Sequence, residues 1–324
     1  MYRVAVIKGG PSSEHDISLE TSKSIFKAIE KLRDKYVAYD VFVTKDGKWH
    51  FRGLPIYPHE LPKHVDVVFN AMHGDYGEDG FLQSILDDIG LPYTGSGSAA
   101  SMLGMNKVRA KRFFEKIGIK TPQDIVFHFD HDGEQDPGAL AHIVYQKFAP
   151  PWIVKPIKGG SSVNTFLCKS FPELVEALSL MMDQGKDTLV EEYISGREGT
   201  VGVVEGLRGE NFYSLPAVEI KTKRDFFDKV AKYTGESEEI CPGNFSEEDK
   251  KQMASIAKDI HEKLGLRHYS RTDFRLHPKK GVYVLEVNTL PGLTSESLLP
   301  KSLNAVGMEL HEFVDHLLQK ALGL

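Results

Sequence analysis

Sequence positions 283–292 read Tyr283-Val284-Leu285-Glu286-Val287-Asn288-Thr289-Leu290-Pro291-Gly292. The stretch begins with alternating apolar residues, carries a carboxylate and an amide near its far end, and breaks at a Pro-Gly pair. This pattern is typical of a strand that ends in a turn. Upstream, residues 269–276 form a second strand-like run, and positions 277–281 between the two runs have the composition of a turn. We therefore predict that the two runs pair as a hairpin.

The predicted register places Asp273 opposite Glu286 and Arg271 opposite Asn288. Because side chains alternate along a strand, these four share one face. Two facing carboxylates repel each other, and a divalent cation would remove that cost. Carboxylate and amide oxygens are the ligands that magnesium prefers, whereas an arginine beside them could hold a phosphate or an oxyanion. The other face of the hairpin would carry Thr272, Phe274, Leu285 and Val287.

A second interpretation of the hairpin is an exposed one whose charges face water. The strand pattern leaves the metal site and the hydrated hairpin equally open, so the rest of the chain has to decide between them.

The composition is that of a soluble globular protein, with 41% hydrophobic and 27% charged residues. The formal net charge of −6 and the pI near 6.1 argue against binding to nucleic acid or to an anionic membrane. We find no apolar run of membrane-spanning length and no signal-peptide pattern. Cys168 and Cys241 stand far apart without metal-ligand spacing, as expected in a reducing compartment. We therefore expect a cytoplasmic enzyme, and 324 residues suffice for two or three compact units.

Two loops near the N-terminus have the composition of ligand-binding loops. Residues 8–13 follow a short apolar strand and lead into a helix with Glu14 at its start. Residues 72–80, which include His73, are rich in glycine and follow a continuous apolar strand. Open α/β sheets bind ligands at such places, although an ordinary strand–helix turn is the alternative.

A third candidate loop follows the strand at 152–156, which contains Lys155. The strand opens into Gly159-Gly160-Ser161-Ser162, whose backbone N–H groups suit a phosphate. This is not the Walker arrangement, which the sequence lacks. Glu191, at the end of an apolar strand, and Glu198, just after a turn, could hold a nucleotide's amine and ribose hydroxyls. Hydrated carboxylates at the rim of the molecule are the alternative.

Residues 222–243 show no period and many charges, and they include Lys232 and Tyr233. We predict that this segment is a functional lid. A separate helix carries a group of cations that is expected to be mostly hydrated: Lys107, Arg109, Lys111 and Arg112.

The run Gly95-Ser96-Gly97-Ser98-Ala99-Ala100 weakly matches a dinucleotide-binding pattern. The strand before it is very short, and the acidic residue at the right distance, Glu115, falls within a helical pattern. A dinucleotide-dependent oxidoreductase is therefore a weak hypothesis. A catalytically silent binding protein is also weak, because facing carboxylates without a ligand would bring no evident benefit.

Taken together, these motifs resemble those of the D-alanine–D-alanine ligases, members of the ATP-grasp superfamily. The likeness runs from the first predicted strand to the last helix, and the order of the motifs agrees. The resemblance rests on Glu14-His15, His73-Gly74, Gly77-Glu78-Asp79-Gly80, Tyr93-Thr94-Gly95-Ser96-Gly97, Val154-Lys155-Pro156, Gly160-Ser161-Ser162-Val163, Arg271, Asp273, Glu286-Val287-Asn288-Thr289 and Pro291-Gly292.

The resemblance implies an α/β (α+β) ATP-grasp fold. An N-terminal open parallel α/β substrate domain would occupy residues 1–104, and two α+β subdomains at 105–200 and 201–324 would clamp ATP. The implied activity is ATP-dependent joining of two D-alanines through an acyl phosphate, for peptidoglycan precursor synthesis. The alternative is a ligase of the same superfamily that takes another amino acid or a hydroxy acid as one substrate.

The resemblance also implies a role for each motif residue. The residues implied to contact ATP are Lys107, Lys155, Ser161, Ser162, Glu191, Glu198 and Lys232. Two Mg²⁺ or Mn²⁺ ions would be held by Asp273, Glu286 and Asn288, and a monovalent cation is a further candidate cofactor. Arg271 and the backbone N–H of Gly292 would stabilise the tetrahedral transition state.

For the substrates, the resemblance implies that Glu14 orients the amino group of the first D-alanine together with Ser161 and Tyr233. His73 would lie near the carboxylate of that substrate. Ser297, beside Leu298, would bind the carboxylate of the second D-alanine. The partners are thus small molecules, with a homodimer as the expected assembly.

Three positions depart from the family pattern. Asn164 stands where glycine is usual, residues 227–230 replace a Tyr-Glu pair, and Gly243 stands where alanine is usual. These departures bear on substrate choice and rate more than on the type of reaction.

Overall fold

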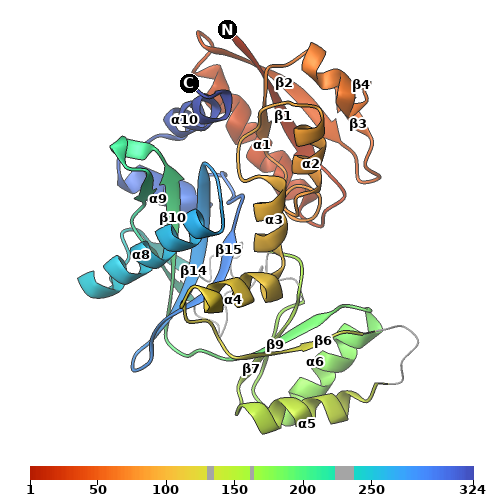
Figure 1. Cartoon of the computed structure of the whole chain (residues 1–324), viewed down its shortest axis with the longest axis vertical. Coiled ribbons are helices and arrows are strands. Elements are labelled where there is room, and N and C mark those ends of the chain that lie inside the picture. The colour runs from red at the N-terminus through yellow and green to blue at the C-terminus, as the bar shows by residue number, and fades with distance from the viewer. Residues whose placement is uncertain (130–134, 161–163, 223–236) are drawn as a thin grey trace.

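The computed structural model describes residues 1–129, 135–160, 164–222 and 237–324. Three sheets follow one another along the long axis of the molecule, and helices cover them (Figure 1). Among the described residues, none of the helices combines the length and the apolar character needed to span a membrane.

The first sheet is the open sheet that the family resemblance implies, and it is mixed: two of its strand pairs are parallel and two are antiparallel. Strand β1 (Tyr2–Gly9) pairs in parallel with a neighbour on each side. Val4 and Val6 face one core and Ala5 and Ile7 face another, so both faces are covered, as is usual for parallel strands. In spatial order the strands are β4 (Leu54–Pro55), β3 (Trp49–Phe51), β2 (Tyr36–Val43), β1 (Tyr2–Gly9) and β5 (Val67–Asn70). The neighbouring helices are α1 (His15–Glu30), η1 (Pro58–Lys63), α2 (Phe81–Asp88) and α3 (Ser98–Met105).

The second sheet is antiparallel and has helices on one side (Figure 1). Its order is β6 (Asp124–Phe127), β9 (Thr188–Glu192), β7 (Trp152–Pro156) and β8 (Phe166–Cys168). The covering helices are α5 (Pro137–Lys147) and α6 (Phe171–Asp183). Asp136 caps α5 by accepting hydrogen bonds from the backbone of Gly138 and Ala139, and proline occupies the first helical position, where no N–H is needed.

The third sheet contains the predicted hairpin at its edge. Its order is β13 (Ser237–Ile240), β12 (Val218–Thr222), β10 (Arg197–Glu205), β14 (Tyr269–His277) and β15 (Gly281–Asn288), with β11 (Phe212–Ser214) also beside β10. The remaining helices are α4 (Lys107–Lys116), η2 (Leu207–Gly209), α8 (Glu247–Lys263), α9 (Leu298–Ala305) and α10 (Leu310–Leu322).

Regular structure occurs near both ends of the predicted lid at 222–243. Thr222 ends β12, and Ser237–Ile240 form β13, which pairs with β12 in antiparallel register. The prediction of an irregular segment was wrong at these ends because backbone pairing with β12 supplies the hydrogen bonds there. Residues 223–236 lie outside the described part.

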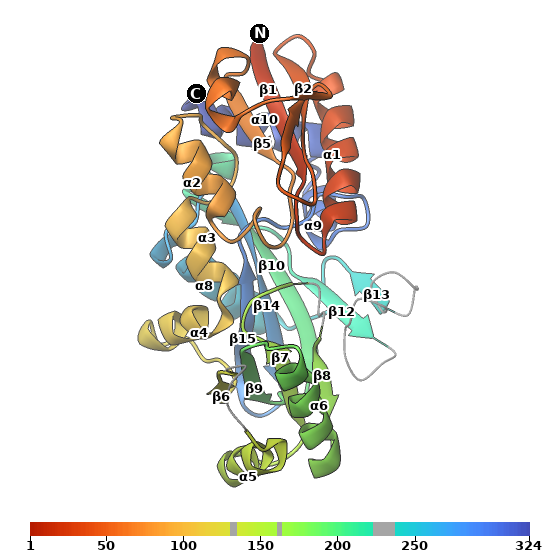
Figure 2. The same cartoon turned by 90° about the vertical axis from the view of Figure 1, so that its right-hand side faces the viewer.

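The last helix, α10, packs against elements from the start of the chain and lies beside the first sheet in both views (Figures 1 and 2). Phe313 of α10 is fully buried and meets the Tyr269 ring edge-on at 5.5 Å. Asp315 accepts a hydrogen bond from the Tyr36 hydroxyl and pairs with Lys35. The first and third sheets therefore share one hydrophobic core. The predicted limits 1–104, 105–200 and 201–324 stay a prediction; β10 begins before residue 201 but belongs to the third sheet.

Helix α3 packs closely on the end of β15, where the predicted metal ligands stand. A methyl group at Gly104 would lie 2.7 Å from Cγ2 of the buried Thr289. Alanine normally stabilises a helix by about 1 kcal/mol relative to glycine. Here the threonine side chain is stiff at χ1, so Gly104→Ala should instead lower the free energy of unfolding by about 1–3 kcal/mol.

Urea unfolding measures this change. The double variant Gly104→Ala/Thr289→Ser removes the obstructing methyl and should regain part of the loss. A single variant as stable as the parent protein would contradict the tight packing of α3 on β15.

Candidate active site

The register of the hairpin is the predicted one. Asp273 pairs with Glu286, and Arg271 pairs with Asn288. A β-bulge follows Asp273, so Phe274 pairs with Val284 and Leu285 is the additional residue. The prediction that Leu285 lies on the face opposite the carboxylates was therefore wrong, because a bulge redirects side chains. Leu285 instead lines the same cleft as Glu286.

That cleft lies between the second and third sheets and encloses about 960 Å³ of space continuous with solvent. Its walls come from α4, β7, β9, β10, β12, β14, β15 and the start of α9. The cleft thus brings together side chains that the sequence singled out separately: Lys107, Lys155, Glu191, Glu198, Arg271, Asp273, Glu286 and Leu298.

Each of the facing carboxylates has a cation near it. Arg271 donates two hydrogen bonds to Asp273, both 2.8 Å long, and the Thr200 hydroxyl donates a third of 2.6 Å. Lys107 Nζ lies 3.9 Å from Glu286 Oε2 and also donates to the Gly159 carbonyl. Burial lowers the pKa of Lys107, whereas for Arg271 the neighbouring Asp273 outweighs burial and raises the pKa.

The donor set Asp273, Glu286 and Asn288 fits a hard divalent cation, since it offers two carboxylates and one amide oxygen. The Asn288 Oδ1 accepts a hydrogen bond from the Leu290 backbone, which fixes the direction of the amide. Within the described ranges, no three His, Cys, Asp or Glu side chains gather as a metal-binding group, so any metal here would need Asn288 or ligand oxygens to complete its shell.

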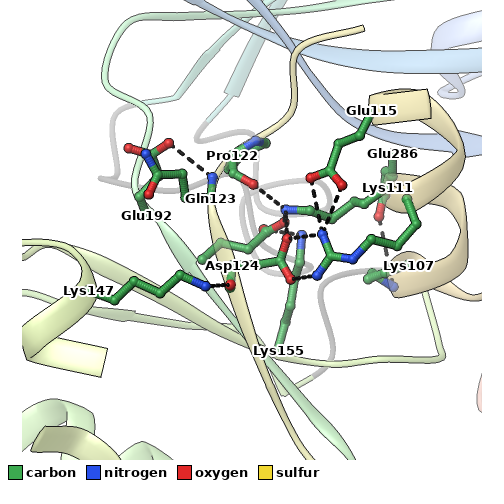
Figure 3. A network of polar contacts seen from close by, with 12 residues as sticks. Lys107, Lys111, Glu115, Pro122, Gln123, Asp124, Lys147, Lys155, Glu192 and Glu286 are labelled. Carbon is green, nitrogen blue, oxygen red and sulfur yellow. Dashed lines mark hydrogen bonds and ion pairs between the residues drawn. The ribbon is translucent and has the colours of Figure 1, made fainter. Parts of the chain in front are cut away.

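A buried ion cluster supports the wall of the cleft (Figure 3). Glu191 lies between two lysines: Lys155 is 2.6 Å from its Oε2, and Lys111 bonds its Oε1. Lys111 also pairs with Asp124 at 3.3 Å and donates to the Pro122 carbonyl. Burial alone would raise the pKa of Glu191, but the two lysine charges lower it to about 2. The carboxylate therefore stays ionised.

Lys111 was expected to be hydrated, and that expectation was wrong. Its side chain is 1% exposed, because α4 turns the positions of Lys111, Ala110 and Phe114 toward the interior. Lys107 precedes Lys111 by one helical turn, so both project from the same face of α4. In the sequence, this spacing was the sign that Lys111 lies on the same face of the helix as Lys107.

The far end of the cleft carries a second ion pair. Arg275 Nη2 lies 2.8 Å from Glu198 Oε2, and the two residues are cross-strand neighbours in β14 and β10. Tyr193 and Glu192 line the cleft beside them. Sequence reasoning missed Arg275, although Arg271, Asp273 and Arg275 occupy alternate positions of one strand.

A separate group of predicted residues lies next to the cleft. A Cβ at Gly160 would lie 3.2 Å from Glu14 Oε2, so Glu14 stands beside the phosphate-loop candidate. A Cβ at Gly292 would lie 2.9 Å from Ser297 Oγ and 4.0 Å from His73 Cε1. The structure therefore brings Gly292, Ser297 and His73 together.

His73 is held by two partners that sequence reasoning did not single out as site residues. Its Nε2 lies 2.8 Å from the Thr21 hydroxyl, and its Nδ1 lies 3.2 Å from Glu78 Oε1. Burial raises the pKa of Glu78. The glycine-rich loop 72–80 supplied the signal for Glu78, since it places both residues in one turn after β5.

Four predicted site residues lie outside the described part: Ser161, Ser162, Lys232 and Tyr233.

Two of the three positions that depart from the family pattern can be described. Asn164 has φ of +57°, a left-handed conformation that asparagine tolerates better than most residues. At Gly243, a Cβ would lie 2.7 Å from the Phe245 ring and 2.9 Å from the Glu219 nitrogen, so the alanine usual in the family would not fit unchanged.

Removal of the buried lysine tests the ion cluster. Lys111→Met keeps the length of the side chain but leaves Glu191 and Asp124 short of a cation, so we expect a loss of about 3–5 kcal/mol in the free energy of unfolding at pH 7. Arg112→Met is the matched control on the same helix. Arg112 also pairs with Asp124, but its side chain is 49% exposed, and the expected loss is at most about 1 kcal/mol.

The effect of Lys111→Met should also depend on pH. A carboxylate with a lowered folded-state pKa stabilises the fold above its unfolded-state pKa, and this contribution is lost as the pH falls toward the folded value. For Glu191 that window runs from 4.5 down to about 2. If Lys111→Met and Arg112→Met lowered the free energy of unfolding equally at pH 7, the role of Lys111 would be contradicted.

Comparisons with known proteins agree with this geometry. The family model described as "D-ala D-ala ligase C-terminus" matches residues 113–319, and "D-ala D-ala ligase N-terminus" matches residues 3–58 and 51–96. A D-alanine–D-alanine ligase of Leptospira biflexa is 36% identical, and the alignment covers 99% of both chains. One of Thermotoga petrophila is 37% identical over 98% of this chain and 97% of the relative.

Solved structures are similar over the same extent. The D-alanyl-alanine synthetase A of Vibrio cholerae has a TM-score of 0.87 at 26% identity, covering 100% of this chain and 99% of the other. The VanG D-Ala:D-Ser ligase of Enterococcus faecalis has a TM-score of 0.84 at 27% identity, covering 99% of each. The D-alanine–D-alanine ligase of Bacillus anthracis, solved in complex with ATP, has a TM-score of 0.80 at 28% identity and covers 100% and 98%. The chain therefore belongs to the D-alanine–D-alanine ligase family and has its ATP-grasp fold.

Proposed function

We propose that this protein joins two D-alanines to D-alanyl-D-alanine at the expense of ATP and so supplies a precursor of peptidoglycan. The observation that carries the proposal is the face of the hairpin: Asp273 opposite Glu286, and Arg271 beside them, in a cleft that also contains Lys107 and Lys155. Cations and paired carboxylates in one cleft suit the transfer of a phosphoryl group.

The nucleotide would occupy the cleft between the two sheets. Lys107 and Lys155 would contact its phosphates, and Glu191 and Glu198 would receive the amine and the ribose hydroxyls. Asp273, Glu286 and Asn288 would hold Mg²⁺ or Mn²⁺, which neutralises phosphate charge when bound. Because Asp273 is bonded to Arg271 and Glu286 lies near Lys107, these cations keep the carboxylates apart until the nucleotide enters.

The amino-acid substrates would bind next to the phosphate end. Glu14, which stands beside Gly160, would orient the amino group of the first D-alanine with Ser161 and Tyr233. His73 would lie near its carboxylate, with the ring fixed by Thr21 and Glu78. Ser297, beside Leu298, would take the carboxylate of the second D-alanine.

The chemistry explains why such groups are needed. A carboxylate resists attack by an amine, and phosphorylation by ATP converts it into an acyl phosphate with a good leaving group. The amine of the second D-alanine then attacks, and negative charge develops on the tetrahedral oxygen. Arg271 and the Gly292 backbone N–H are the donors that we assign to this charge. A homodimer and a cytoplasmic location are further proposals that rest on the family resemblance.

An assay of product formation tests the proposal. With D-alanine, ATP and Mg²⁺ we expect phosphate release in a one-to-one ratio with D-alanyl-D-alanine, measured by mass spectrometry. L-alanine is the control and should give neither product. Because one similar structure is a D-Ala:D-Ser ligase, D-serine mixed with D-alanine is included. Phosphate release only in the mixture, with the mixed dipeptide as product, would overturn D-alanyl-D-alanine as the product.

Arg271→Ala tests the assigned oxyanion donor. Deletion of one such donor lowers turnover by about 10²–10³-fold. ATP binding, measured by calorimetry, should change far less, because Lys107 and Lys155 remain. Arg267→Ala is the matched control, since that arginine lies over the Tyr93 ring and does not line the cleft. Turnover close to that of the parent protein would remove Arg271 from this role.

A further inference from the structure

Arg275 is a buried cation to which the proposed reaction assigns no task. It is 7% exposed and lines the cleft, two positions after Asp273 on β14. Arg271 and Asp273 stand at the phosphate end of that strand. Arg275 lies about 13 Å from Arg271 if each residue of a strand advances the chain by about 3.3 Å. This places Arg275 at the end of the cleft where Glu198 stands.

Three contacts fix the guanidinium of Arg275. Nη2 lies 2.8 Å from Glu198 Oε2, and Nη1 donates a 3.1 Å hydrogen bond to the Gly196 carbonyl. The Cζ atom lies 5.7 Å from the centre of the Tyr193 ring. An arginine fork held on two sides is planar and rigid, so it fixes the direction of a carboxylate better than a single point charge does.

Glu198 is in turn confined by this contact. Its side chain is 13% exposed, and Arg275 is its cross-strand partner. Burying a carboxylate is costly unless a cation lies beside it, and a glutamate side chain has several rotamers among which to choose. Arg275 meets both needs from the neighbouring strand.

We infer that Arg275 is a positioning residue for the nucleoside: it holds the Glu198 carboxylate toward the cleft so that this carboxylate accepts the hydroxyl groups of a ribose. The inference rests on the proposed use of ATP and deepens it. It predicts that recognition of the sugar, and not of the phosphates, depends on an arginine that itself need not touch the sugar.

Binding of nucleotides without D-alanine tests the inference. Calorimetry compares ATP with 2′-deoxyATP and 3′-deoxyATP. The parent protein should prefer ATP over at least one deoxy analogue by about 10-fold, the effect of one hydrogen bond to a charged group. Arg275→Met should weaken ATP binding and bring that ratio close to one. Arg275→Lys, which keeps the charge, should retain part of the preference.

The matched control is Arg197→Met. Arg197 stands on the strand that carries Glu198, but it pairs with Glu219 and lies over the Phe245 ring, away from the cleft. The control should keep the preference for ATP. Glu198→Gln should lose the preference, and the double variant Arg275→Met/Glu198→Gln should lose little more than either single variant, as expected when one residue acts through the other.

The outcomes separate the two proposals. A parent protein that binds no ATP would refute the proposed function and the inference together. Equal binding of ATP and both deoxy analogues by the parent protein would overturn the inference alone. Additive losses of affinity in the double variant would also overturn it. An Arg275→Met protein with an unchanged ratio of ATP affinity to deoxy-analogue affinity would do the same. Thermal unfolding of each variant shows that it is folded before binding is measured.

Discussion

The repulsion between Asp273 and Glu286 is the constraint on which the site depends. The two carboxylates face each other across neighbouring strands, and each is held by a cation from a different element. Arg271 comes from β14 itself, whereas Lys107 comes from the first turn of α4. Lys107 also donates to the Gly159 carbonyl, and Lys111 of the same helix bonds Glu191. The polar contacts of α4 therefore reach both the hairpin and the second sheet.

A second set of buried charges would be hard to explain by stability alone. Buried ion pairs often add little to stability, because removing two charges from water costs nearly as much as their attraction returns. In the cluster of Lys111, Glu191, Asp124 and Lys155, however, Glu191 and Lys155 line the cleft themselves, and Lys111 and Asp124 support them. Its lysines keep Glu191 ionised and hold one carboxylate oxygen each, so this part of the cleft wall carries a charge of fixed position.

The sequence predicted what depends on local periodicity and failed where the tertiary structure decides. Alternation along two strands was enough for the register of the hairpin, because a slip of one residue would move Asp273 and Glu286 to different faces. No pattern in the sequence indicates the bulge at Leu285. In the sequence, Lys111 and Arg275 resemble ordinary surface cations. In the structure, the second sheet covers Lys111 and β10 covers Arg275. Their partners, Glu191 and Glu198, are about 80 positions away in the chain, and no local pattern connects such pairs.

Strand β14 links the two ends of the proposed nucleotide site. Its alternate side chains Arg271, Asp273 and Arg275 all line the cleft, so a single strand sets the separation between the proposed phosphate contacts and the proposed sugar contacts. Each of the two arginines holds a carboxylate: Arg271 holds Asp273, and Arg275 holds Glu198. Strand pairing on both sides of β14 resists any change in that spacing. A ligand of matching length therefore meets donors and acceptors that are already in place, which lowers the ordering entropy lost on binding.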